Sequence, residues 1–362
     1  SIGGGESGRK NLCAEVIEYT SPEETAVCNL ASVALPAFWK DGTFDHQALH
    51  AQAQRLVENL DRVIDRNFYP IPEAKRSNLR HRPMGIGVQG LADLFLAAKL
   101  PWDSDGAWQL HREVFETLYH GAVTASARLA WEKGAYESFK GSPANRGLFQ
   151  FDLWHAERRN RGEPVPATGV ELYASGRWDW ESLRQEMTTS GLRNSLLVAL
   201  MPTASTASLL GNTEGIEPVP ALVYKRNVLS GEYVRTSRAL VRDLEERGLW
   251  TREVKDRIVA SDGSIQAVPG IPEDLKRLHR TVWEIPQRVL LDLAADRGAF
   301  VCQSQSLNVF FREPTIAKLT SMHFHGWQKG LKTGSYYNRQ ASVRTAQQVT
   351  DSVALEKALR SV

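Results

Sequence analysis

The stretch Asn194-Ser195-Leu196-Leu197-Val198-Ala199-Leu200 decides the fold class. Its apolar residues follow one another without the polar alternation of a half-buried strand, and polar residues precede the run. Such a run is typical of a strand that is covered on both faces, as in parallel sheets. It leads directly into a small, hydroxyl-rich segment, residues 201–211. The sequence therefore predicts a buried strand followed by a tight turn.

Helical patterns surround this strand. Apolar residues recur at helical spacing over 46–66, which predicts an amphipathic helix with Asp45 as its N-cap. Pro70 and Pro72 are expected to prevent helix just beyond it. Further helices are predicted at 91–98, 105–133, 178–190, 236–247, 272–276, 286–296 and 319–330, a surface loop at 157–166, and a second buried strand at 306–310. Buried strands that alternate with helices predict an α/β fold with a largely parallel sheet.

Residues 85–90, GIGVQG, match the dinucleotide-binding pattern GxGxxG. That pattern needs a buried strand before it and an acidic residue for the ribose after it. The preceding Arg80-His81-Arg82-Pro83-Met84 does not look like a strand, and no such acid follows. We therefore interpret the glycines as a tight turn that enters a helix. A Rossmann-type dehydrogenase is the weaker alternative, which an NAD(H) titration would test.

The segment after the decisive strand is a candidate anion site. Thr203, Ala204, Ser205 and Thr206 lie between a buried strand and a predicted helix. Free backbone N–H groups at a helix start attract phosphate, and α/β proteins place ligands at the carboxyl ends of strands. The alternative is that the hydroxyls only cap the helix.

A second candidate site is Asn11-Leu12-Cys13-Ala14-Glu15. If this stretch is extended, Asn11, Cys13 and Glu15 point to the same side. A thiol, an acid/base group and an amide would then converge, as chemistry on a hydroxylated substrate requires. The alternative is a buried cysteine with polar neighbours at the rim of a strand.

Three further motifs have a redox or a structural interpretation. Cys28 can supply half of a dithiol for a two-electron reduction, or it can be an inert thiol. Tyr336 and Tyr337 can relay a radical, because a phenol can lose an electron and a proton together, or they can be packing anchors. His323 and His325 face different sides of a helix, so we expect no metal site there.

Composition limits the class of protein. The chain has 362 residues, 42% of them hydrophobic and 24% charged, with a net charge of +2. The charge gives no argument for nucleic acid or membrane binding, and no apolar run is long enough to span a bilayer. Three cysteines indicate a reducing, cytoplasmic setting. Residues 1–10 are expected to be a flexible lead-in, 11–340 a single catalytic unit, and 341–362 a helical tail.

Together these segments resemble the large (alpha) subunit of class I ribonucleoside-diphosphate reductase in its eukaryote-like form. The matching stretches, in family order, are NLCAEV from Asn11, AVCNLASVAL from Ala26, RHRPMGIGVQGLAD from Arg80, NSLLVALMPTASTASLLGNTEGIEP from Asn194, SQSLNVFF from Ser304 and LTSMHFHGWQKGLKTGSYYNR from Leu319. The resemblance implies the C-terminal half of a ten-stranded α/β barrel, with a central finger loop that carries the radical cysteine.

The resemblance also implies a role for each candidate residue. Cys13 would be the thiyl radical that removes the substrate 3′-hydrogen, Glu15 the base at the 3′-hydroxyl and Asn11 a hydrogen-bonding amide. Cys28 would be one of the two reducing cysteines. Thr203, Ala204, Ser205 and Thr206 would hold the diphosphate, and Tyr336 and Tyr337 would carry the radical from the small (beta) subunit.

The same resemblance implies the cofactors and partners. This chain would bind no metal itself. It would receive its radical from a metal-containing beta subunit and its electrons from a thioredoxin- or glutaredoxin-type protein. The second reducing cysteine, the effector-binding segments and the C-terminal reducing tail of the family have no counterpart in this sequence, and Cys302 matches no catalytic position. We therefore expect one part of a split alpha subunit, which works with an N-terminal alpha half on a separate chain. A fragment of a longer alpha chain, or a chain from which an element before Ser1 was removed, are the alternatives for its origin. The alternative is a catalytically silent chain with an assembly or regulatory role.

Overall fold

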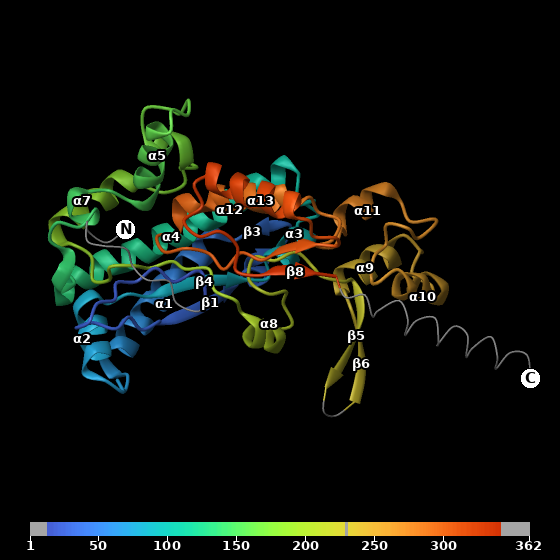
Figure 1. The fold of residues 1–362 in the computed structure, drawn as a ribbon, viewed down its shortest axis with the longest axis horizontal. Helices are drawn as coiled ribbons and strands as arrows, with labels where there is room; N and C mark the ends of the chain where they lie inside the picture. The colour runs from blue at the N-terminus through green and yellow to red at the C-terminus, as the bar shows by residue number, and fades with distance from the viewer. Residues whose placement is uncertain (1–12, 229–230, 342–362) are drawn as a thin grey trace, which may run out of the picture.

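The computed structural model describes residues 13–228 and 231–341 (Figure 1). The predictions for residues 1–10, for Asn11 and for 342–362 lie outside this range. The α-helices are α1 His46–Arg66, α2 Pro72–His81, α3 Leu91–Ala97, α4 Asp105–Lys133, α5 Gln150–Asn160, α6 Gly169–Tyr173, α7 Trp180–Ser190, α8 Ala204–Leu210, α9 Arg238–Glu246, α10 Arg252–Ala260, α11 Glu273–Leu278, α12 Gln287–Arg297 and α13 Ile316–Gln328. The strands are β1 Leu30–Ala34, β2 Trp39–Lys40, β3 Thr43–Phe44, β4 Gly85–Gln89, β5 Val223–Val228, β6 Gly231–Thr236, β7 Val309–Phe311 and β8 Asn338–Gln340.

Parallel strand pairing organises the centre of the molecule, which confirms the predicted α/β class. Strand β1 pairs with β4 in parallel, and β7 pairs with β8 in parallel. Between these pairs the predicted strand 194–200 is extended and makes two isolated parallel bridges, from Val198 to Ile86 and from Leu200 to Gln305. The decisive stretch is therefore a bridging segment rather than a full strand. The described strands form two-stranded sheets and do not close into a barrel.

The glycine-rich stretch 85–90 is a buried strand, β4, so the predicted tight turn is wrong. Its glycines allow a close approach between neighbouring segments. A Cβ on Gly85 would lie 2.8 Å from the Cβ of Ala199, and one on Gly87 would lie 2.8 Å from the carbonyl oxygen of Ala199. Only Gly90, with φ of 75°, makes the turn into α3.

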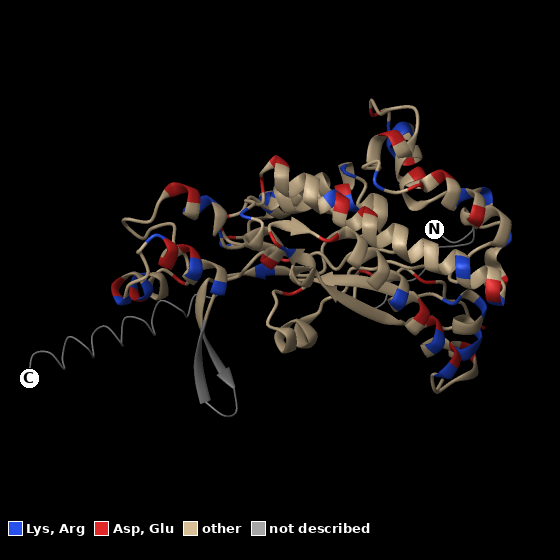
Figure 2. Ribbon diagram, turned by 180° about the vertical axis from the view of Figure 1, so that it is seen from behind, with Lys and Arg blue, Asp and Glu red and all other residues tan. Residues whose placement is uncertain are grey.

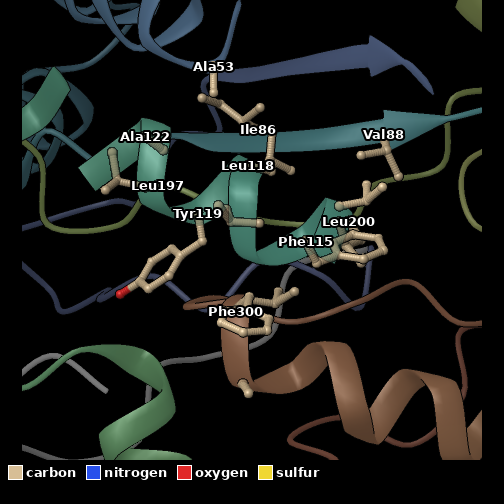
Figure 3. Packing of buried hydrophobic residues seen from close by; sticks show 14 of the residues in the cluster. Ala53, Ile86, Val88, Phe115, Leu118, Tyr119, Ala122, Leu197, Leu200 and Phe300 are labelled. Atoms are coloured by element: carbon tan, nitrogen blue, oxygen red, sulfur yellow. The ribbon is translucent and has the colours of Figure 1, made fainter. Parts of the chain in front are cut away.

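Two long helices cover this centre and form its main core. Helices α1 and α4 pack along each other and bury apolar side chains against β4. Figure 3 shows Phe115, Leu118 and Ala122 of α4 beside Ile86 and Val88 of β4. This packing covers one side of β4 with apolar side chains.

The helix predictions are largely confirmed. Helix α1 begins after Asp45, whose carboxylate accepts the Ala48 N–H at 2.9 Å. Pro72 does not prevent helix, because it is the first residue of α2, where its missing N–H needs no partner. The predicted surface loop 157–166 is helical up to Asn160, the end of α5.

A second, smaller core lies at one end of the molecule (Figure 1), where the β5–β6 hairpin and helices α9 to α11 come together. The sequence analysis did not predict the hairpin. Asp243 of α9, 2% exposed, accepts hydrogen bonds from Lys99 and from His279. These contacts join this end to the turn after α3. Within the described residues, no helix is long and apolar enough to cross a membrane.

Candidate active site

The finger segment, residues 13–18, lies against the strand-like residues 303–306 from the other end of the chain. The Ala14 N–H donates to the Ser306 hydroxyl at 3.1 Å, and the Ile17 N–H donates to the side chain of Gln303 at 2.9 Å. The Ser304 N–H donates to the Glu15 carbonyl at 2.8 Å. Residues 13–15 form a bend and a turn, so the extended conformation that would point Cys13 and Glu15 to the same side is not present. Ser306 nevertheless contacts this segment twice, because it accepts from the Ala14 N–H and donates to the Glu15 carboxylate.

Cys13 and the two tyrosines lie in contact. The Cys13 sulfur is 3.7 Å from the Tyr336 hydroxyl oxygen. The ring centroids of Tyr336 and Tyr337 are 4.0 Å apart. The hydroxyl of Tyr337 and the thiol of Cys13 both raise the pKa of Tyr336, so it stays protonated near neutral pH. The arrangement is a continuous series of three oxidisable groups, and it reaches the surface at Tyr337, which is 49% exposed.

Glu15 lies beside this series and is 1% exposed. Burial raises the pKa of Glu15, and a hydrogen bond from the Ser306 hydroxyl opposes that rise. A raised pKa makes the ionised carboxylate a stronger base, which favours a general-base role. Ser306 was not singled out from the sequence, although a hydroxyl at the start of a predicted buried strand, after the polar residues Ser304 and Gln305, was a usable signal.

Glu18 is a second buried carboxyl of the finger segment, and the sequence analysis did not single it out. It is 3% exposed, and burial raises its pKa to about 8. Its Oε1 accepts from Gln303 at 3.3 Å, and its Oε2 has no hydrogen-bond partner among the described residues. Gln303 also donates to the Met84 carbonyl at 3.1 Å, so this one amide ties the finger segment to β4.

The hydroxyl-rich turn lies at the carboxyl end of the bridging segment, as predicted. Thr203 is the N-cap of α8, but its hydroxyl makes no cap and instead accepts the Gly215 N–H at 2.8 Å. Ala204, Ser205 and Thr206 are exposed in the first turn of α8. Figure 2 shows α8 without charged residues, projecting from the body of the molecule. Three residues before Thr203, Leu200 pairs with Ser304 and Ser306, the residues that hold Glu15.

Cys28 is exposed and lies two residues before β1. The segment between Cys13 and Cys28 is anchored at Glu24, which is 3% exposed. The Glu24 carboxylate contacts Arg80 and lies 2.5 Å from His81 Nε2, and both contacts help to lower its pKa against the opposing effect of burial. On the other side, Asn29, the residue after Cys28, donates to the Pro83 carbonyl at 2.9 Å. Cys28 is thus held between two polar anchors.

The remaining candidates have structural positions. The N–H groups of Leu197 and Val198 donate to the Cys302 sulfur at 3.1 and 3.2 Å, which supports our interpretation of Cys302 as structural. His325 pairs with Asp292 at 2.8 Å, and His323 is exposed. Among the described residues, no cluster of three His, Cys, Asp or Glu side chains could hold a metal ion.

Comparison with known proteins gives one consistent result. Residues 8–337 match the family model "Ribonucleotide reductase, barrel domain". The ribonucleoside-diphosphate reductase large chain of Schizosaccharomyces pombe is 51% identical over 95% of this chain and 41% of its own length. The large subunit of Dictyostelium discoideum is 52% identical over 96% of this chain and 39% of its own.

A solved structure agrees. The class Id ribonucleotide reductase alpha subunit of Actinobacillus ureae superposes with a TM-score of 0.69 at 25% identity, over 93% of this chain and 54% of that one. The chain thus spans about 40% of the length of the curated relatives it matches.

Proposed function

Since the chain belongs to the ribonucleotide reductase barrel-domain family, we propose that it carries the catalytic centre of a ribonucleoside-diphosphate reductase. The contact between Cys13 and Tyr336, with the ring of Tyr337 tilted against that of Tyr336, is the observation that carries this proposal. It supplies a short path from the protein surface to a thiol. Glu15 and the exposed turn at Ser205 supply the base and the anion site that such chemistry needs.

The proposed reaction begins with the tyrosine pair. An oxidised Tyr337 takes an electron and a proton from Tyr336, and Tyr336 takes a hydrogen atom from the Cys13 thiol. The resulting thiyl radical removes the 3′-hydrogen of the ribose, while the Glu15 carboxylate accepts the 3′-hydroxyl proton. Cys28 and a second thiol give two electrons and two protons and become a disulfide: one proton leaves with the 2′-hydroxyl as water, and the other proton and the two electrons form the new C2′–H bond. Glu15 returns the proton of the 3′-hydroxyl, and Cys13 returns the 3′-hydrogen atom and is again a thiyl radical.

The chain is proposed to work with three further components. A metal-containing beta subunit supplies the first oxidation, a thioredoxin- or glutaredoxin-type protein reduces the disulfide, and an N-terminal alpha segment supplies the second thiol. In the described residues β1 pairs with β4 on one edge only, so its other edge can accept a further strand. A cytoplasmic setting fits thiols that must be re-reduced.

Reconstitution tests this proposal. The full chain is mixed with the N-terminal segment of a relative and a beta subunit, and deoxyribonucleotide formation from a ribonucleoside diphosphate is measured. We expect turnover that Cys13→Ser abolishes. Equal turnover by Cys13→Ser would refute the catalytic role. A silent assembly chain would give the same background rate with either protein.

A further inference from the structure

Asn308 holds the backbone of Tyr337. It is 2% exposed, and its Oδ1 accepts the Tyr337 N–H at 3.1 Å. On either side, the Tyr336 N–H donates to the Leu307 carbonyl at 2.7 Å, and the Val309 N–H donates to the Tyr337 carbonyl at 3.0 Å. Main-chain groups of Leu307 and Val309 therefore bond to the main chain of the two tyrosines. Of these three hydrogen bonds, the one from Tyr337 to Asn308 involves a side chain.

Glu217 contacts the nitrogen end of the Asn308 side-chain amide. Its Oε1 accepts from the Asn308 Nδ2, so the amide is oriented with its oxygen toward Tyr337. Burial and the nearby Glu214 raise the pKa of Glu217 to about 7, while Asn308 and Arg339 act in the opposite direction. The carboxyl can accept from Asn308 whether or not it is protonated. Glu217 therefore fixes the direction of an amide that could otherwise turn over.

The turn that carries Glu217 is itself attached to the candidate phosphate turn. The Gly215 N–H donates to the Thr203 hydroxyl at 2.8 Å, and the Glu217 N–H donates to the Glu214 carbonyl at 2.9 Å. A continuous set of hydrogen bonds and short covalent links therefore runs from Thr203 through Gly215 and Glu217 to Asn308. It ends at the main chain of Tyr337.

We propose that Glu217 and Asn308 are positioning residues that fix Tyr337 against Tyr336, and that the turn 213–217 joins this clamp to Thr203. Tyr337 is half exposed, so side-chain packing alone holds it weakly. Besides Tyr336, its ring has a guanidinium neighbour, Arg339, 5.4 Å from the centroid. A hop between adjacent phenols depends on their separation, so the clamp sets the rate of electron and proton transfer between Tyr337 and Tyr336. That consequence rests on the proposed radical transfer, whereas the clamp itself does not.

Amide hydrogen exchange of the full chain tests the clamp directly. Asn308→Ala removes the acceptor of the Tyr337 N–H, and we expect that amide to exchange at least about fivefold faster. Glu217→Ala should give a smaller increase at the same amide, and Glu217→Gln, which keeps an acceptor for Asn308, should restore protection. Ser335→Ala is the matched control, because its hydroxyl contacts Asn338 and not Tyr337. It should leave the Tyr337 amide unchanged.

Two further variants separate the loss of this hydrogen bond from a general loss of stability and test the link to Thr203. Asn308→Asp keeps an acceptor for the Tyr337 N–H and should retain its protection even if Asn308→Ala lowers the stability of the whole chain. Thr203→Val removes the acceptor of the Gly215 N–H, and we expect faster exchange at both Gly215 and Tyr337. Exchange at Tyr337 that is unchanged in Asn308→Ala would overturn the clamp. Exchange that changes at Gly215 alone in Thr203→Val would overturn the link to the phosphate turn.

The reconstituted complex then tests the consequence. Asn308→Ala should lower kcat about tenfold or more without a matching change in KM, and Glu217→Gln should remain close to the unaltered protein. If no complex turns over, the proposed function fails while the exchange result still decides the clamp. If the complex turns over and Asn308→Ala matches the unaltered kcat despite faster exchange, Tyr337 needs no such positioning and the proposal falls.

Discussion

The Cys13 sulfur lies 3.7 Å from the Tyr336 hydroxyl, although 323 residues separate the two in the chain. Tyr336→Phe removes that hydroxyl and keeps the ring that contacts Tyr337. A phenyl group cannot give up a hydrogen atom at this potential, so we expect turnover of the reconstituted complex to fall to background. Tyr224→Phe, an exposed tyrosine on β5, should retain full activity. Product formation by Tyr336→Phe at the unaltered rate would exclude the path through this residue.

Ser306 adjusts the basicity of Glu15. Its hydroxyl donates to the carboxylate and opposes the rise in pKa that burial causes. Ser306→Ala removes that opposition, so the pKa of Glu15 should rise further. The ionised base then forms only at higher pH, and the acidic limb of the kcat/KM profile should move upward. Ser304→Ala, which removes the neighbouring contact to Thr333, is the control and should leave that limb in place.

Glu18 makes the stability of the chain depend on pH. Its pKa is raised from 4.5 to about 8 by burial. Between these values the unfolded chain releases a proton that the folded chain keeps, so the free energy of unfolding falls as pH rises and levels off above about 8. Glu18→Gln lacks this loss and should gain roughly 2–5 kcal/mol over the unaltered chain between pH 4.5 and 8. Urea unfolding at both ends of this range measures it, with the exposed Glu186→Gln as the control that should show no such gain.

The turn at α8 gives a graded prediction for substrate affinity. Ser205 is exposed in the first turn of the helix, where a hydroxyl can donate to a phosphate oxygen. Ser205→Ala should weaken ribonucleoside diphosphate binding about 2–10-fold, the range for one lost hydrogen bond. Ser205→Asp should weaken it further, because it places a negative charge beside the diphosphate. Ser208→Ala, in the last turn of the same helix, should bind as the unaltered chain does. Calorimetric titration separates the three variants.

Local patterns predicted the helices better than the strands. Asp45 and the apolar spacing of 46–66 are local signals, and α1 follows them to the residue. The strand β4 was interpreted as a turn because its glycines weaken any local strand pattern. Their reason is tertiary, since Ala199 approaches Gly85 and Gly87 from a segment more than a hundred residues away. Pairing of this kind cannot be read from one stretch of sequence.

Residue type and order singled out the candidate reactive groups but not the residues that contact them. Cys13, Glu15 and the two tyrosines carry recognisable chemistry, so they could be singled out from residue type and order. Ser306, Gln303 and Asn308 have ordinary side chains whose function depends on where the finger segment and the tyrosines lie against them. Only a folded chain reveals that placement.

The finger segment can attach to residues 303–306 only after those residues have been synthesised. A ribosome makes Ala14 first, and the Ser306 that receives its N–H emerges 292 residues later. Until then Cys13 has been made, but its later contact, Tyr336, has not. A nascent chain that stops before residue 303 contains α1 and α4 but lacks the residues that contact the finger segment. The order of translation therefore delays this attachment until Ser306 has been made.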